Sequence, residues 1–441
     1  MKEKIIQFGT GNFLRGFADC FVDKLNKENL YDGKIVIVSP TDSKQVDIIN
    51  AQQGRYNLYL RGIENGKEIC ESTEINAISR AINPYRDFNA YLALAENPDF
   101  RFIISNTTEA GIAFSAENKF AHKPAKSFPA KLTQLLYERY KLDLNGFVIL
   151  ACELIDDNAK QLEKCVLAYA RLWNLGEDFC SWVINKNDFC NTLVDRIVTG
   201  YPKDEAEQLC KKFGYNDKLL DTAEPYHLWV IDGNYENELP LQKAGLNVIW
   251  TDNVSVYKKM KVRILNGSHT SLVFPSLLCG VETVKQSLDD KALNIFLNTC
   301  LYDYILPALG ETAENRQFAN AVLERFANPY IKHMWQSISL NSVSKFTARV
   351  LPTITDYTDK NNALPKPLVF SLACLIEYYK NNEVQDDKWA VEYIRNHSVK
   401  DILSNAELWG CDLSAMFDMV DKSLCRIHSD GIREAMKWAL L

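Results

Sequence analysis

Short, wholly apolar strands that alternate with helical segments constrain the fold of this chain more than any other feature. The segment Lys4–Phe8 predicts a buried strand that leads through a glycine turn into an amphipathic helix over Phe13–Leu25. Further strands are predicted at Ile35–Val38, Phe102–Ile104, Phe147–Leu150 and Asn247–Trp250. Apolar strands separated by helices are typical of a parallel sheet covered on both faces. The first half therefore predicts an α/β fold with a doubly wound parallel sheet.

The strand pattern ends at about residue 255, and long helical periodicities follow it. The helices are predicted at Leu293–Leu306, Ala319–Phe326, Leu368–Tyr379 and Lys388–Asn396. A chain of 441 residues is also long for a single hydrophobic core. We therefore expect two domains, an α/β domain over residues 1–255 and a mostly α-helical domain over residues 256–441.

Composition excludes several classes of protein. The formal net charge is −7 with acids and bases interspersed, which argues against a surface for nucleic acid or anionic membranes. The apolar stretches are too short to span a membrane, and the N-terminus shows no signal-peptide pattern. The 12 cysteines form no C-x-x-C pair. We expect free thiols in a cytoplasmic protein without a metal site; a zinc site is the alternative reading.

A glycine loop follows the first strand directly and opens a helix. In the segment GTGNFLRG, the glycines Gly9 and Gly11 let the backbone approach a pyrophosphate, and the helix start offers free N–H groups. The candidate cofactor-binding residues are Gly9, Gly11, Asn12, Phe13 and Arg15. The pattern is not a full G-x-G-x-x-G, because Leu14 occupies the third glycine position. A plain strand–turn–helix junction fits the same segment.

Polar residues follow two further strands. Asp42, beyond the second strand, could hydrogen-bond a ribose hydroxyl and so favour NAD over its 2′-phosphorylated form. A solvated loop aspartate fits equally well. The segment 105–111 lies where a doubly wound sheet places its crevice, so Thr107 and Glu109 are candidate cofactor contacts. A hydrogen-bonded turn is the alternative there.

The segment KVRILNGSH (261–269) carries the predicted chemistry. On an ideal helix, Asn266 lies about 140° and His269 about 80° from Lys261, so one broad face can hold all three. Burial disfavours a charged ammonium, which makes a shielded lysine suitable as a general acid or base. Asn266 and His269 could then polarise a carbonyl or hold a hydroxyl. Gly267 inside a helix indicates a close backbone approach.

A structural interpretation of the same three residues stays open. Lysines on helix faces are usually solvated, and a lone histidine is more often a structural hydrogen-bonding residue.

The glycine loop and the lysine segment together resemble the long-chain mannitol dehydrogenase family. Lys261, Asn266 and His269 match its K-x-x-x-x-N-x-x-H signature, and GTGNFLRGF resembles its G-x-G-x-F-x-R loop. The resemblance is strongest to members that act on hexuronates. Supporting blocks run in order through about three quarters of the chain: SNTTEAGI (105–112), CELID (152–156), TLVDRIVTGYP (192–202), LDTAE (220–224), LNGSHT (265–270) and NPYIKH (328–333).

The resemblance implies an N-terminal Rossmann-type, dinucleotide-binding domain, a helical substrate and catalytic domain, and an active site between them. It also implies metal-independent hydride transfer with NAD. Lys261 is similar to the family's general acid/base, Asn266 to an oxyanion stabiliser and His269 to a substrate-holding group. Asp195, Lys332 and Lys345 match family positions near the substrate. One departure is Leu154, which stands where mannitol dehydrogenases carry a second polarising asparagine and cannot hydrogen-bond.

The predicted function is the NADH-dependent, reversible reduction of a ketone in a sugar acid. The carboxylate of this substrate needs a cation, and the candidates are Lys332, Lys345, Arg349 and Arg196. One alternative is a sister enzyme acting on fructuronate and mannonate, or on mannitol and fructose. Two others come from different classes: a non-catalytic NAD-binding regulatory protein and a metal-dependent lyase or hydrolase. The presence of Lys261, Asn266 and His269 favours an enzyme.

Overall fold

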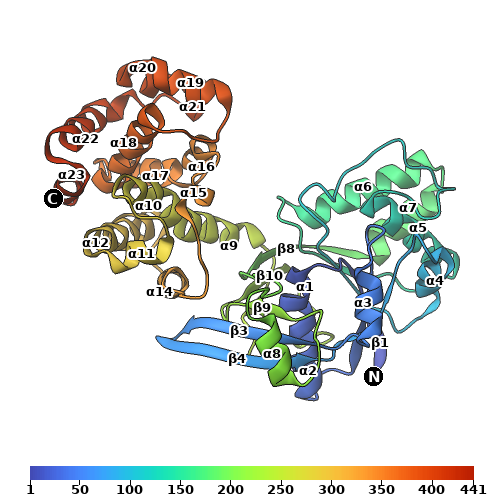
Figure 1. Cartoon of the computed structure of the whole chain (residues 1–441). Helices are drawn as coiled ribbons and strands as arrows, with labels where there is room; N and C mark the ends of the chain where they lie inside the picture. The colour runs from blue at the N-terminus through green and yellow to red at the C-terminus, as the bar shows by residue number, and fades with distance from the viewer. The chain divides into compact units, whose positions relative to one another are not determined.

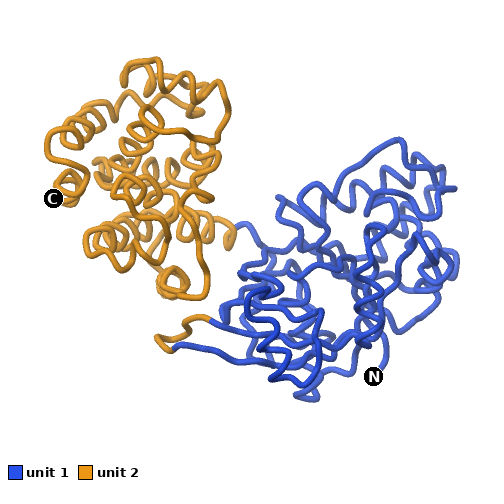
Figure 2. The backbone as a smooth tube through the Cα atoms, viewed as in Figure 1, with its two compact units in different colours: residues 1–61, 68–255 blue, residues 62–67, 256–441 orange.

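The computed structural model describes residues 1–441, which divide into two compact units (Figure 2). Unit 1 comprises residues 1–61 and 68–255, and unit 2 comprises residues 62–67 and 256–441. Unit 1 is α/β, whereas unit 2 is built of helices apart from the short segment 62–67 (Figure 1). The α/β doubly wound fold class and the helical second half are confirmed. No helix in the chain is both long and apolar enough to span a membrane.

All eleven strands lie in unit 1, except for the ends of two of them that fall within residues 62–67. They are β1 (Lys2–Phe8), β2 (Gly33–Val38), β3 (Tyr56–Glu64), β4 (Lys67–Ile75), β5 (Ile78–Ile82), β6 (Phe102–Ser105), β7 (Val148–Ala151), β8 (Asp188–Asp195), β9 (Asp221–Ala223), β10 (Leu228–Asp232) and β11 (Val248–Thr251). Eight of them form the main sheet in the order β11-β10-β8-β7-β6-β1-β2-β5, and the other three form the sheet β4-β3-β9.

The main sheet is parallel except at one pair of strands. All five predicted strands are present, as β1, β2, β6, β7 and β11. Neighbouring strands from β5 to β8 in this order are parallel. In the centre, Ile5 of β1 lies opposite Ile35 of β2 on one side and opposite Phe102 of β6 on the other. The exception, which the sequence did not predict, is the antiparallel pair of β8 and β10. The connection between these two strands runs through residues 196–227 and contains β9, so its length would allow either direction.

Helices cover both faces of the main sheet because successive strand residues point to opposite sides. Ile5 packs in one core cluster and its neighbour Ile6 in the other. Unit 1 contains the following helices: α1 (Asn12–Leu14), η1 (Arg15–Asp19), α2 (Cys20–Lys27), α3 (Gln45–Ala51), α4 (Phe88–Leu92), η2 (Ala93–Glu96), α5 (Phe128–Lys141), α6 (Asn158–Leu172), α7 (Glu177–Lys186) and α8 (Ala206–Phe213).

A hairpin of β3 and β4 turns at Asn65-Gly66, where both residues have positive φ (52° and 72°). An Asn-Gly pair favours this two-residue turn, because both residues tolerate left-handed backbone. The hairpin is not among the predicted strands, because the residues of β4 are mostly polar and exposed. The tip of the hairpin, residues 62–67, groups with unit 2, where Glu324 accepts hydrogen bonds from the backbone N–H groups of Asn65 (3.1 Å) and Gly66 (2.8 Å).

The helices of unit 2 pack around α10 and α18. They are α9 (Val254–Lys261, which begins at the boundary), η3 (Val262–Asn266), α10 (Gly267–Leu278), α11 (Val284–Asp289), α12 (Lys291–Thr299), η4 (Cys300–Ile305), α13 (Leu306–Leu309), α14 (Ala313–Phe326), α15 (Trp335–Ile338), α16 (Ser342–Arg349), α17 (Leu351–Asn361), α18 (Lys366–Asn381), α19 (Lys388–Asn396), α20 (Val399–Ser404), α21 (Ala406–Trp409), η5 (Ser414–Met416), α22 (Phe417–Asp430) and α23 (Ile432–Ala439). α18 is buried along most of its length, from Pro367 to Ile376.

Candidate active site

The glycine loop of unit 1 joins β1 to α1 with two glycines in different roles. Gly9 has φ +138°, and a Cβ there would lie 2.7 Å from the carbonyl oxygen of Asn106. Only glycine therefore lets the end of β1 lie against the segment after β6. Gly11 is the N-cap of α1, and no side chain caps this helix start. A Cβ at Gly11 would meet no atom within 4 Å. The helix start is thus open, and it fits the pyrophosphate of a dinucleotide.

The neighbouring loop residues shape this turn. Arg15 is 3% exposed, and its guanidinium donates to the carbonyl oxygen of Thr10 (2.7 Å) and to Oδ1 of Asn12. The ring of Phe13 stacks on Phe17 with 5.0 Å between centroids. Arg15 therefore holds the loop from inside the protein, while Gly11 and Asn12 are exposed at its surface.

Asp42 lies beyond the end of β2 on the surface of unit 1. Its Oδ1 accepts a hydrogen bond from Nδ2 of Asn83 (2.8 Å) and lies 3.4 Å from Nε of Arg86. Arg86 also donates to both carboxylate oxygens of Asp47. The end of β2 thus offers a carboxylate with an arginine beside it, the two groups that bind a ribose hydroxyl and a 2′-phosphate respectively.

A buried glutamate joins the ends of β6 and β7. Glu153 is 2% exposed; its Oε1 accepts from the backbone N–H (3.0 Å) and Oγ1 (3.1 Å) of Thr107, and its Oε2 from Oγ of Ser105 (3.0 Å). Burial raises the pKa of Glu153, and these hydrogen bonds oppose the shift. Thr107 is therefore oriented by Glu153, whereas Glu109 is exposed beyond it. Glu153 lies in the block CELID but is not among the predicted site residues, although an acid that follows a buried strand directly is a signal for such a role.

The predicted catalytic segment of unit 2 is one continuous helical run with a wider turn inside it. α9 ends at Lys261, η3 is a π-helical turn over Val262–Asn266, and α10 begins at Gly267. The prediction that this segment is helical is confirmed, but the angles of an ideal α-helix do not apply across η3. π-turns occur frequently at functional sites because they displace side chains from the regular register.

Four polar atoms of this run are buried without a partner. They are Oδ1 of Asn266, Oγ of Ser268, Nε2 of His269 and Oγ1 of Thr270. Buried polar atoms nearly always have a hydrogen-bond partner, so this group, which includes the predicted Asn266 and His269, indicates a place for a ligand. Lys261, the last residue of α9, is half-buried.

Aromatic side chains surround the imidazole of His269. It stacks on Phe326 at 4.1 Å between centroids, and the rings of His333 (5.1 Å) and Trp335 (6.0 Å) meet it edge-on. Trp335 is held by a hydrogen bond from its Nε1 to Oγ of Ser287 (2.8 Å). Phe326, His333 and Trp335 are not among the predicted site residues, because only tertiary packing brings them to His269.

His269 is neutral in this environment. Burial is the main cause that lowers its pKa well below the usual range, and the positive charges of His333, Arg325, Arg349 and Lys345 lower it further. The imidazole therefore offers a hydrogen bond to a substrate without adding a positive charge.

The remaining predicted substrate residues are in different settings. Lys345 is half-buried and donates from Nζ to the carbonyl oxygen of Ile338 (2.8 Å), whereas Lys332 is exposed. Asp195 is buried at the end of β8, opposite Leu228 of β10. Leu154 is 61% exposed. The structure thus brings Lys345, but not Lys332, into the group of charges that act on His269.

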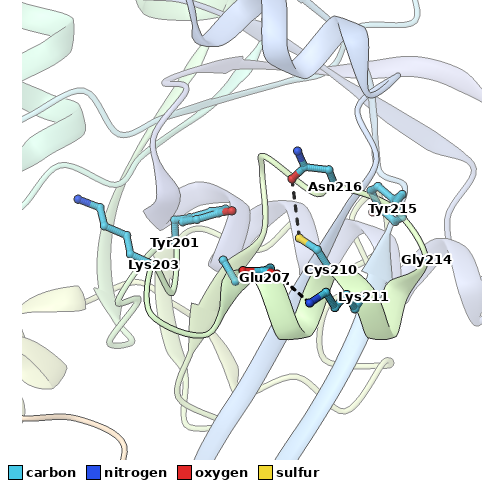
Figure 3. A pocket seen from close by; sticks show the side chains of 9 residues that line it. Tyr201, Lys203, Glu207, Cys210, Lys211, Gly214, Tyr215 and Asn216 are labelled. Carbon is cyan, nitrogen blue, oxygen red and sulfur yellow. Dashed lines mark hydrogen bonds and ion pairs between the residues drawn. The ribbon is translucent and has the colours of Figure 1, made fainter.

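A surface pocket of about 840 Å³ on unit 1 contains none of the predicted residues (Figure 3). It lies around α8, between Tyr201 and Tyr215, and Lys211 there is paired with Glu207 at 2.7 Å. The chain contains no group of three or more His, Cys, Asp or Glu side chains arranged to hold a metal ion, and all 12 cysteines are free. The candidate chemistry therefore rests on the glycine loop and the α9–η3–α10 run.

Comparison with known families agrees with both halves of this description. The model of the mannitol dehydrogenase Rossmann domain matches residues 3–243, and that of the mannitol dehydrogenase C-terminal domain matches residues 253–427. The chain belongs to the mannitol dehydrogenase family, which confirms the resemblance seen in the sequence. It is accordingly an oxidoreductase that acts on a CH–OH group with a nicotinamide cofactor.

Particular relatives narrow the comparison. The chain is 40% identical to the altronate oxidoreductase of Bacillus subtilis (strain 168), with 99% of this chain and 95% of the relative covered. It is 42% identical to the altronate oxidoreductase of Yersinia enterocolitica, with 98% and 96% covered.

Two solved structures share the fold. A substrate-free D-sorbitol dehydrogenase has a TM-score of 0.87 and 23% identity, covering 99% of this chain and 95% of that one. The Pseudomonas fluorescens mannitol 2-dehydrogenase, a ternary complex with NAD and D-mannitol, has a TM-score of 0.71 and 21% identity, covering 100% and 94%.

Proposed function

We propose that this chain catalyses the reversible reduction of D-tagaturonate to D-altronate with NADH, a step of hexuronate catabolism. The observation that carries the proposal is the identity of 40–42% to altronate oxidoreductases over nearly the full chain. The positive charges of Arg325, Arg349 and Lys345 near His269 support it, because an acidic protein needs a local basic site for an anionic sugar acid.

NAD is the proposed form of the cofactor. The open helix start at Gly11 fits the pyrophosphate, and Asp42 at the end of β2 fits a ribose with a free 2′-hydroxyl. Arg86, beside Asp42, is paired with Asp47. To bind the 2′-phosphate of NADP, Arg86 would have to give up this pair. When bound, the reduced nicotinamide supplies the hydride that reduces the ketone.

The residues of unit 2 supply the proton and hold the reacting oxygen. Nζ of Lys261 donates a proton to the oxygen of the ketone as its negative charge grows, and takes the proton back in the oxidation of altronate. The amide of Asn266 donates a hydrogen bond to the same oxygen. His269 holds a substrate hydroxyl through Nε2, and the stacking of Phe326 fixes the plane of the imidazole.

A substrate panel tests the proposal. We expect turnover of tagaturonate with NADH, followed by absorbance, at a kcat/KM well above that for fructuronate and fructose, and well above that with NADPH. A preference for fructuronate or fructose would overturn the proposed substrate and leave the family. A preference for NADPH would overturn the proposed role of Asp42. Full activity after treatment with a chelator would exclude a metal-dependent lyase or hydrolase.

A further inference from the structure

Arg349 is a half-buried cation that has no partner within the chain. It is the last residue of α16, its side chain is half-buried, and its guanidinium makes no hydrogen bond, ion pair or ring contact. Burial lowers the pKa of Arg349, with no opposing contribution from an acid. Since a partly desolvated charge is costly unless it is paired, this arrangement indicates an anion that the chain does not provide.

The other enclosed arginines of the chain are paired. Arg263, in η3, donates to Oγ1 of Thr353 (2.7 Å) and to Oδ2 of Asp356 (2.7 Å). In unit 1, Arg139 donates to four backbone carbonyl oxygens, and Arg196 to those of Glu224 and Gly16. Arg349 differs from these arginines in having no such partner.

Backbone packing places Arg349 beside the catalytic run. A Cβ on Gly267 would lie 3.2 Å from the carbonyl oxygen of Arg349, so the end of α16 approaches the start of α10 directly. Gly267 follows Asn266 and precedes His269 by two residues, the residues whose orphaned atoms mark the candidate ligand position. The glycine that the sequence marked as a close approach therefore accommodates the α16 backbone.

The alternative cations are less suited to bind an anion there. Lys345, one turn earlier on α16, already donates to Ile338, and the negative charge of Asp386 acts on it. Lys332 is exposed and is not among the charges that act on His269. The guanidinium of Arg349 also presents parallel N–H groups that match both oxygens of a carboxylate, which an ammonium does not.

We propose that the guanidinium of Arg349 binds the carboxylate of the sugar acid, and that this residue distinguishes sugar acids from neutral sugars. The inference rests on the proposed function and adds the specificity-determining residue. The carboxylate supplies the negative charge that the cluster around His269 lacks, while Lys261 and Asn266 act on the ketone of the same molecule.

The test compares tagaturonate with D-tagatose, which carries a hydroxymethyl group where tagaturonate carries its carboxylate. For Arg349→Met we expect the KM for tagaturonate to rise about 100-fold, since a charge-assisted bidentate pair is lost, with kcat nearly unchanged. The kcat/KM for tagatose stays within about threefold. Arg349→Lys gives an intermediate KM, because lysine keeps the positive charge but lacks the two parallel N–H groups of the guanidinium. For Arg349→Ala, added guanidinium in the millimolar range restores activity on tagaturonate.

Matched controls separate this role from a structural one. Arg426→Met removes an exposed arginine of α22 that is paired with Asp430, and it leaves both substrates unaffected. An unchanged preference for tagaturonate in Arg349→Met, or an equal loss on both sugars, would overturn the assignment. A wild-type preference for fructuronate would overturn only the proposed substrate, and the same variants would then be compared on fructuronate and fructose. A wild-type preference for neutral sugars would overturn both.

Discussion

Buried carboxyls near the glycine loop of unit 1 and buried or half-buried cations around His269 of unit 2 are compensated differently. In unit 1, Asp19 and Asp221 are buried beneath the glycine loop; burial raises the pKa of Asp19 to about 8 and that of Asp221 to about 7, and the charge of Arg15 opposes both shifts. In unit 2, burial lowers the pKa of His269, Lys345 and Arg349.

Both signs are present inside unit 1. Gln7 donates to Asp19 (3.5 Å), while its own Oε1 and an oxygen on each of the two aspartates have no donor. Nε of Arg15 is also without an acceptor, and a proton held by a carboxyl can supply a donor to one of these oxygens. Around His269, by contrast, every charge that acts on the imidazole is positive. The buried carboxyls of unit 1 thus have a cation of the same fold, Arg15, acting on them, whereas the imidazole of His269 has no acid among the charges that act on it, which is the difference on which the proposed anionic ligand rests.

The largest expected effect is that of Lys261→Ala, which removes the proposed proton donor of unit 2 without changing unit 1. We expect kcat to fall about 1,000-fold, within the range of general acid–base catalysis, while NADH still binds. Steady-state kinetics and the fluorescence of bound NADH measure the two properties. Lys259→Ala, on the exposed side of the same helix, serves as the control and retains activity. A Lys261→Ala enzyme with wild-type kcat would refute the role of this residue.

The second effect removes the internal cation of unit 1. Arg15→Met leaves the buried Asp19 without a positive charge, Asp221 with only that of Arg196, and Thr10 and Asn12 without their donor. We expect a loss of about 3 kcal/mol in stability at pH 8 and weaker NADH binding. Thermal unfolding with and without NADH measures both. The matched change is Arg55→Met, at an exposed arginine near Glu74, where a loss below about 0.5 kcal/mol is expected. Similar losses in both variants would mean that Arg15 is not a buried counter-charge.

The third prediction concerns pH. Because the folded state raises the pKa of Asp19 to about 8, its stabilising contribution is complete below the unfolded value near 4 and is lost as the pH rises toward 8. Each pH unit in that window is worth about 1.4 kcal/mol. Asp19→Asn removes this dependence, so the variant should gain in stability relative to wild type between pH 5 and pH 8. Urea unfolding at several pH values measures the difference, and parallel curves for the two proteins would contradict the shift.

The smallest expected effect tests the contact between α10 and α16. Gly267→Ala places a methyl group 3.2 Å from the carbonyl oxygen of Arg349, so α16 has to shift slightly away from α10. We expect the KM for tagaturonate to rise a few-fold with kcat unchanged, and stability to change by no more than about 1 kcal/mol. Arg349→Met combined with Gly267→Ala should show no further rise in KM. An additive effect would show that Gly267 acts independently of Arg349.

The local patterns of unit 1 predicted its buried strands but not its polar ones. Lys4–Phe8 and Phe147–Leu150 are apolar enough to identify their strands, since a strand covered on both faces needs apolar residues throughout. The mostly polar strand β4, and the antiparallel pairing of β8 with β10, depend on neighbours that are distant in sequence. Strand pairing is decided by these neighbours, so no local pattern could reveal it.

The candidate site divides in the same way. Lys261, Asn266 and His269 lie within nine residues, and their spacing alone placed them on one helical run with a glycine at its centre. The π-turn between Lys261 and Asn266, the rings around His269 and the approach of Arg349 to Gly267 came only from the tertiary structure. Helical periodicity is a property of neighbours along the chain, whereas the burial of a charge and the absence of its partner depend on segments that only folding brings together.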